Sequence, residues 1–390
     1  MSIAAYVRVG VSLLPLCLAF AGLNGCTAVI DGNPADSSTR GPGAGPGTQA
    51  SGGGSGEVTP VTPEECATAT TQPGPSPIRR LTRDEYNHTV HDLLNDATAP
   101  GSSFPSEELA LNFPNNADIQ TVSSLLIEGY ETASIALATE AVKDLPTLLG
   151  CDPATTGEDQ CVQSFISSFG LKAYRRPLAA DEVASLVDLY TTSKASYDFS
   201  TAVRLTLQSM LQSPYFLYRV EALGPQTVTR LSGYEIASRL SYLLWSSMPD
   251  TALFAAAASG ALDTADGVSE QAQRMLLDPR ANQSVLTFFE NWLDLQKLKH
   301  GDAKDPAACP TFTAALVPLL RQESDLFLSD VFFNGGDLKT LLLGNYTFMN
   351  KPLADYYKVT GPTGDAFEKV TLDGSKRLGF LTQAGFLAGY

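Results

Sequence analysis

Two pairs of adjacent arginines are the residues of this chain best suited to bind an anion. Arg79 and Arg80 stand before one expected helix, and Arg175 and Arg176 stand before another. A guanidinium group donates two parallel hydrogen bonds to a carboxylate, so the pairs could hold an anionic partner such as a haem propionate or an acidic glycan. They could instead pair with acidic residues of the capped helices and fix the angle between helices. In a chain this acidic, the sequence favours the structural role.

Two other groups of side chains could hold a metal ion. Asn115, Asn116 and Asp118 offer oxygen atoms in a loop, the ligand type that calcium prefers, although such side chains also stabilise turns. His88 and His91 are three residues apart on one helical face, where they could bind a transition metal or a diffusible haem. No third ligand accompanies them at a motif spacing, so an exposed helix face explains them more simply. Neither group makes a metal-binding motif.

Aromatic and acidic side chains together could recognise a sugar. The aromatic residues that could stack on sugar rings are Tyr215, Phe216, Tyr218, Trp245, Phe288, Phe289 and Trp292. The carboxylates that could form the pair of a glycosidase are Glu290, Asp294, Glu323 and Asp325. The helical spacing of the aromatic residues makes them core residues first, and acidic residues are too frequent here for a specific pairing. No motif of a serine hydrolase, phosphate-binding loop or dinucleotide fold appears in the required strand and helix context, so catalytic residues are unknown.

Helices with well-defined starts must position these side chains. Thr82 can cap a first turn with its hydroxyl, and Glu85 stands three residues later to complete a capping box. Leu81 can pack on Tyr86 across this cap. The pattern recurs at residues 230–236, with a serine and a glutamate at the same spacing, and more loosely at 176–183. An internal duplication or convergent helix-start chemistry would each explain the recurrence.

The rest of the apolar residues recur mainly at a helical period. Helices are expected within residues 121–149, 162–173, 201–220, 269–277, 283–295 and 314–333. Strand-like alternation is clearest at 366–372, where Asp373 and Gly374 could form the turn of a hairpin. The sequence therefore predicts a mainly α fold, an irregular multi-helix bundle. A boundary near Pro225 would divide it into two helical subdomains, at residues 78–224 and 225–376.

The N-terminal 25 residues are typical of a lipoprotein signal peptide. Arg8 precedes a short apolar run that ends in Leu23-Asn24-Gly25-Cys26, which resembles a bacterial lipobox and makes Cys26 the expected lipidated residue. An ordinary secretory signal is the alternative. Residues 26–77 are rich in Gly, Pro, Ser and Thr and predict a flexible, disordered tether. Thr27 is not the aspartate that indicates inner-membrane retention, so we expect the outer membrane, on its periplasmic or cell-surface side.

The net charge and the cysteine content indicate which binding partners and which disulfides to expect. The formal net charge is -16, which argues against nucleic acid as a partner. Cys151 and Cys161 are ten residues apart around a turn-rich stretch and are expected to form a disulfide, which leaves Cys66 with Cys309 as a less certain pair. There is no Cys-x-x-Cys-His sequence for covalent haem attachment, so no cofactor is expected in this chain.

Several stretches, in the same order, resemble one known family. They are Arg79-Arg80-Leu81-Thr82, Phe113-Pro114-Asn115-Asn116-Ala117-Asp118, Ala173-Tyr174-Arg175-Arg176-Pro177-Leu178, Ser213-Pro214-Tyr215-Phe216-Leu217-Tyr218-Arg219 and Leu240-Ser241-Tyr242-Leu243-Leu244-Trp245. The family is the set of domains of unknown function first defined beside planctomycete cytochrome c modules (the PSD and PSCyt domains), also common in myxobacterial lipoproteins. The resemblance extends from about residue 78 to the end. Residues 377–390 resemble the start of a further module of the family, so a C-terminally truncated product is expected.

The resemblance implies a role in the cell envelope. Many relatives carry a fused haem c module, which makes an electron-transfer assembly the natural context and a c-type cytochrome or another envelope protein the expected partner. The sequence thus predicts an exported lipoprotein that is held at the membrane by its lipid and acts as a scaffold or binding module, plausibly a redox one. The alternative is an extracytoplasmic enzyme that acts on polysaccharide or another polymer.

Overall fold

Helices make up most of the residues that the computed structural model describes, which are 76–221, 228–299, 309 and 311–389. The prediction of a mainly α fold is confirmed. The predicted signal peptide, Cys26, Cys66 and all but the last two residues of the predicted tether lie outside the described residues. Within the described ranges, no helix is long and apolar enough to span a bilayer. The proposed division near Pro225 stays a prediction.

The first helix of the described residues, α2 (Arg83–Leu94), begins as the sequence predicts. The Thr82 hydroxyl accepts a hydrogen bond from the Glu85 amide, and the Glu85 carboxylate accepts one from the Thr82 amide at 2.9 Å. Leu81 and Tyr86 are both 1% exposed on either side of this cap. The same capping box opens α10 (Gly233–Leu244) through Ser232. The hydroxyl and carboxylate together satisfy amides that would otherwise be unpaired, which explains both helix starts.

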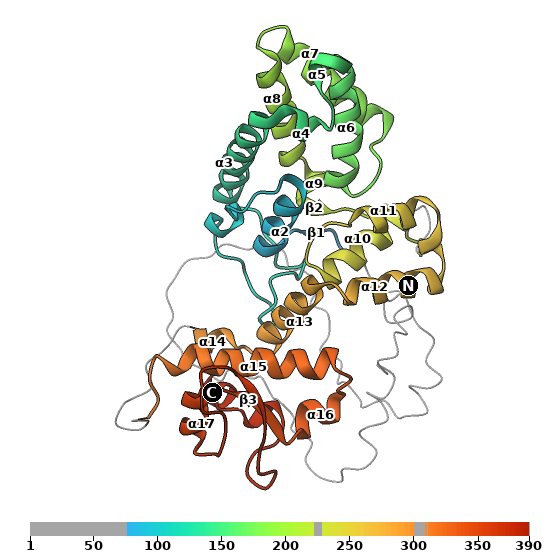
Figure 1. The fold of residues 1–390 in the computed structure, drawn as a ribbon. Coiled ribbons are helices and arrows are strands. Elements are labelled where there is room, and N and C mark those ends of the chain that lie inside the picture. The colour runs from blue at the N-terminus through green and yellow to red at the C-terminus, as the bar shows by residue number, and fades with distance from the viewer. Residues whose placement is uncertain (1–75, 222–227, 300–308, 310, 390) are drawn as a thin grey trace, which may run out of the picture. The chain divides into compact units, whose positions relative to one another are not determined.

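The helices that follow α2 pack together with it around one hydrophobic core of the described residues. These elements are η3 (Pro100–Ser103), α3 (Ser124–Ala141), η4 (Val142–Asp144), α4 (Leu145–Leu149), α5 (Pro153–Thr156), α6 (Glu158–Tyr174), α7 (Ala180–Lys194), α8 (Phe199–Gln212) and α9 (Pro214–Leu217). Helix α8 packs against both α3 and α7 (Figure 1). Cys151 and Cys161 form the predicted disulfide, with their Cα atoms 6.0 Å apart. Cys309 is exposed and has no disulfide partner among the described residues.

Two expected helices are shorter in the structure because capping residues interrupt them. The helix expected at 121–149 ends at Ala141, and Asp144 caps a separate short helix, α4. The helix expected at 201–220 ends at Gln212, where Ser213 caps α9 and Pro214 occupies its first turn. Proline lacks an amide hydrogen and disfavours helical geometry in the residue before it. Pro214 therefore accounts for the end of α8. After α9 the chain continues as the strand β2 (Tyr218–Arg219).

β2 connects the end of this helical region to the segment that precedes α2. It pairs in antiparallel register with β1 (Arg79–Arg80), so that Arg79 lies opposite Arg219. The Leu81 amide also donates to the Leu217 carbonyl at 2.9 Å. The first strand of the described residues is thereby fixed beside a segment that lies much later in the chain.

A second core forms around Trp245. Its helices are α10, α11 (Thr251–Ala258), η5 (Ala261–Asp263), α12 (Ala265–Leu276) and α13 (Pro279–Trp292). The Trp245 ring nitrogen donates to the Met275 carbonyl at 3.0 Å, and the residue is 2% exposed. Trp245 is therefore a core residue, as its helical spacing suggested.

The C-terminal part packs on the long helix α15 (Leu316–Phe333). It also contains α14 (Gln296–Lys299), α16 (Leu338–Leu343), β3 (Tyr346–Met349), α17 (Lys351–Tyr357), β4 (Glu368–Thr371), η6 (Phe380–Thr382) and α18 (Ala384–Gly389). The strand expected at 366–372 is present as β4, but the hairpin turn at Asp373 and Gly374 was wrong. β4 instead pairs in antiparallel register with β3, which lies earlier in the chain, and Tyr346 lies opposite Thr371. Figure 1 shows α17 and β3 beside α15, in agreement with their contacts.

Candidate functional site

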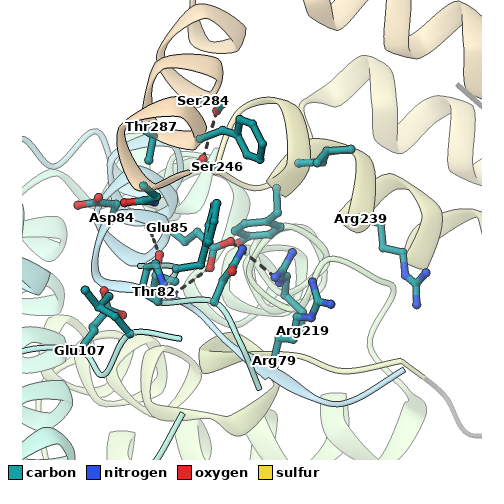
Figure 2. Close-up of a pocket in the computed structure, with 18 of the residues that line it drawn as sticks. Arg79, Thr82, Asp84, Glu85, Glu107, Arg219, Arg239, Ser246, Ser284 and Thr287 are labelled. Carbon is teal, nitrogen blue, oxygen red and sulfur yellow. Dashed lines mark hydrogen bonds and ion pairs between the residues drawn. The ribbon is translucent and has the colours of Figure 1, made fainter. Parts of the chain in front are cut away.

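A pocket of about 620 Å³ lies where three distant stretches of chain meet. Residues 76–115 supply one wall, residues 219–221 supply a second, and residues 235–296 on α10, α13 and the start of α14 supply the third. The β1–β2 pairing brings the first two stretches together. A concave site of this volume is large enough for a small organic ligand. Figure 2 shows the side chains that converge on it.

Three arginines lie on one side of the pocket. Arg79 and Arg219 come from the paired strands, and Arg239 comes from α10 (Figure 2). Arg239 forms a bidentate pair with Glu221, with Nη2 2.6 Å from Oε2. Arg219 Nη2 lies 3.7 Å from a Glu85 oxygen. This side of the pocket is thus a set of guanidinium groups only partly neutralised by two carboxylates.

Arg79 has the fewest contacts of the three. Its side chain makes no hydrogen bond or ion pair to any residue that the structure describes. Burial, followed by repulsion from Arg219 and Arg239, lowers the pKa of Arg79. The guanidinium group is so strongly basic that it stays charged near neutral pH. An anion placed against it would relieve this repulsion.

The opposite side is acidic and polar. Asp84 and Glu107 line the pocket near the start of α2, on the side away from the arginines (Figure 2). Glu107 accepts a hydrogen bond from the Arg83 amide at 3.0 Å, but burial raises the pKa of its carboxyl group. Hydroxyl groups of Ser246 and Ser284 lie 3.1 Å apart on the third wall. The pocket therefore offers cationic donors at one side and acceptors at the other.

Aromatic rings from the first and third walls also line the pocket. Phe113 and Phe288 line the pocket with their ring centres 5.8 Å apart. Phe288 is 49% exposed and contacts Trp292, which is 52% exposed, at 5.9 Å. Half-exposed rings next to polar groups present a face on which a ligand can stack.

Of the four arginines singled out in the sequence, the structure places only Arg79 in the pocket. Arg175 is 3% exposed and donates to the carbonyls of Tyr215, Phe216 and Tyr218 at 2.6–3.1 Å. Its guanidinium group joins the short helix α9 to the start of β2. Arg175 therefore has the structural role that the sequence favoured.

The other two arginines also contact the protein itself. Arg80 is 6% exposed and donates to the Tyr130 hydroxyl at 3.1 Å. Arg176 forms a bidentate pair with Glu182 of α7 at 2.7 and 2.8 Å, and its guanidinium lies over the Tyr215 ring. Arg176 thus pairs with an acidic residue in the first turn of a helix, which is the structural role considered from the sequence.

The residues considered as metal ligands do not converge. Asn115 lines the pocket, whereas the Asn116 side chain accepts a hydrogen bond from the Asp118 amide at 3.0 Å, as in an Asx turn. His88 and His91 both lie on α2, with His91 exposed at the surface. Among the described residues, no group of three or more His, Cys, Asp or Glu side chains is arranged to hold a metal ion.

The four carboxylates considered for a glycosidase separate into two sites. Glu290 and Asp294 line the pocket, and Glu290 also pairs with Arg321 at 2.9 Å. Asp325 pairs with the same arginine at 2.8 Å. Glu323 is fully buried elsewhere and accepts hydrogen bonds from Thr347 and Tyr357.

Sequence reasoning missed Arg219, Arg239, Glu107 and Asp84 as pocket residues. Arg219 belongs to a stretch that was recognised, but its position opposite Arg79 depends on a two-residue strand pairing. So short a strand has no periodicity to detect. Only an expectation of which distant segments pair could have found this site.

The fold and the pocket define a helical protein in which three successive domains line one large pocket of the described chain. Three family models match in this order: PSD3, a protein of unknown function (DUF1587), at residues 79–143; PSD5 (DUF1595) at 161–221; and PSD4 (DUF1592) at 231–359. The chain belongs to the planctomycete cytochrome c-associated PSD family. No curated protein and no solved structure matches the chain.

Proposed function

We propose that this chain is an exported lipoprotein that serves as a binding module in a cell-envelope assembly with a c-type cytochrome. The observation that carries the proposal is that each of the three PSD domains contributes to one pocket. PSD3 contributes Arg79, PSD5 contributes Arg219, and PSD4 contributes Arg239 and Phe288. A pocket that needs all three domains gives a physical reason for them to occur together.

The lipid anchor is tested at Cys26. Replacing Cys26 by serine removes the thiol that receives the diacylglycerol group, so labelling of the protein with a radioactive fatty acid should be abolished. Fractionation of the envelope should then no longer find the variant in the outer membrane. Cys309→Ser is the matched control, because it removes a cysteine that is exposed in the folded part. Labelling that persists in Cys26→Ser would contradict the anchor.

The cytochrome partnership is tested by co-purification from the native envelope. The tagged chain, isolated after mild detergent extraction, should carry a protein band that stains for covalently attached haem. A tagged version containing only the signal and residues 26–77 is the control, because it retains the lipid but lacks the three domains. Equal haem staining in both samples, or none in either, would overturn the partnership.

The alternative, an enzyme acting on polysaccharide, is favoured by one observation. Glu107 and Asp84 lie in the same pocket as the exposed ring of Phe288, and burial raises the pKa of Glu107, as a general acid requires. An enzyme of this kind would release reducing ends from a polysaccharide, and Glu107→Gln would abolish that release. A binding module would release none.

A further inference from the structure

We infer that the pocket binds an acidic sugar: a uronic acid unit of an oligosaccharide, with its carboxylate against Arg79 and Arg219 and its ring against Phe288. The inference rests on the proposed binding function and names the ligand for the same pocket. It follows from donors that lack partners, from the distribution of charge around the pocket, and from the exposed aromatic wall.

Unused hydrogen-bond donors lie together on the basic side. The Arg79 guanidinium has no partner among the described residues. Arg219 Nε is buried and likewise has no hydrogen-bond partner in the described part of the chain. Arg79 is exposed, so water can satisfy its donors, whereas the buried Arg219 Nε without a partner is costly. A carboxylate is the group that satisfies neighbouring guanidinium groups most directly. Arg239 is already paired with Glu221, so the free donors suit one anionic group.

The rest of the lining limits how much negative charge the ligand can carry. Besides the three arginines, the pocket is lined by Asp84, Glu85, Glu107, Glu221, Glu235, Glu290 and Asp294. These carboxylates outnumber the arginines and would repel a densely charged polyanion such as a nucleic acid or polyphosphate. They accept hydrogen bonds well from hydroxyl groups. The lining therefore fits a ligand with one carboxylate and many hydroxyls.

The uncharged part of the lining fits a sugar ring. Phe288 exposes about half of its surface beside Phe113, which offers an aromatic face to the apolar face of a pyranose. Asn112, Gln283 and Asn291 line the pocket, and their amide groups make no hydrogen bond within the described residues. An amide both donates and accepts, so it can bind adjacent hydroxyls on one ring. A porphyrin would instead place a wide apolar face against these polar groups at a large desolvation cost.

Calorimetric titration of the whole chain with uronic acid trimers tests the inference. The probes are the trimers of galacturonate, glucuronate and mannuronate, each compared with its neutral methyl ester. At least one acid trimer should bind at least tenfold more tightly than its ester, because a charge-assisted hydrogen bond contributes on the order of tenfold or more in affinity. Arg79→Gln should remove this difference. Arg204→Gln is its matched control, since Arg204 lies on α8, outside the pocket lining.

The aromatic contact is tested separately. Phe288→Ala should weaken binding of acid and ester alike, by roughly fivefold. Tyr197→Ala is the control, since Tyr197 is 59% exposed and lies outside the pocket lining. Equal binding of acid and ester, binding of haem or an acidic peptide in place of the trimers, or no binding of any trimer at millimolar concentration would each overturn the inference. Uronate binding without a cytochrome partner would instead retain the ligand and reject the assembly.

Discussion

Replacing Arg175 by methionine should lower the free energy of unfolding by about 3–5 kcal/mol. The Arg175 guanidinium donates to three main-chain carbonyls between residues 215 and 218, and Nη1 lies 3.3 Å from the Tyr242 hydroxyl. Methionine fills similar space but donates nothing, so these acceptors would be left without the cation that satisfies them. Urea denaturation followed by far-ultraviolet circular dichroism measures the change.

Arg176→Met is the matched control for this prediction. Arg176 is adjacent in sequence, but its side chain is 34% exposed and its main partner is Glu182 on the surface of α7. Partly exposed pairs contribute about 1 kcal/mol or less, so the loss should be several times smaller than for Arg175. Equal losses in the two variants would show that Arg175 has no special role in joining α9 to β2.

Glu323 should make the protein less stable as the pH rises from about 4.5 to 7. Burial raises the pKa of Glu323 to about 7, from 4.5 for an exposed glutamate, although hydrogen bonds from Thr347 and Tyr357 oppose the shift. In this interval the unfolded chain loses the proton and the folded chain keeps it. The contribution of Glu323 is therefore fully present below pH 4.5 and is lost as the pH reaches 7, by roughly 3 kcal/mol.

Glu323→Gln isolates this effect from that of other groups. The amide imitates the protonated carboxyl and can retain the contacts to Thr347 and Tyr357. The variant should match the original protein near pH 4.5 and exceed it in free energy of unfolding at about pH 8. Glu368→Gln, at an exposed position on β4, should keep the original pH dependence. If the Glu323→Gln variant and the original protein lose stability in parallel over this interval, Glu323 titrates as an exposed group.

Local chemistry explains which features the sequence could predict. The capping boxes at Thr82 and Ser232 need only residues three positions apart, and the disulfide of Cys151 and Cys161 needs only ten. Side chains that interact over one or two helical turns leave a signature that a single sequence retains. The helix starts and the mainly α class follow from such signatures.

The pocket depends on contacts with no such signature. Arg79 and Arg219 meet through a pairing of two residues per strand, and Phe288 reaches them through the packing of α10 against α13. The hairpin predicted after β4 was wrong for the same reason. The turn at Asp373 was predicted from the local sequence, whereas the strand that pairs with β4 is β3, which lies earlier in the chain. Pairing between distant segments is set by tertiary packing, and local propensity carries little information about it.

The pairing of β1 with β2 also bears on how the protein reaches its folded state. As the chain is synthesised from its N-terminus, β1 emerges early and can pair only after Arg219 of β2 has followed. Closing so long a loop adds little to the final entropy cost, but contacts of high sequence separation slow folding. The third wall of the pocket lies later still in the chain, on α10 and α13, which pack against each other. The pocket is therefore complete only when all three of its walls are in place.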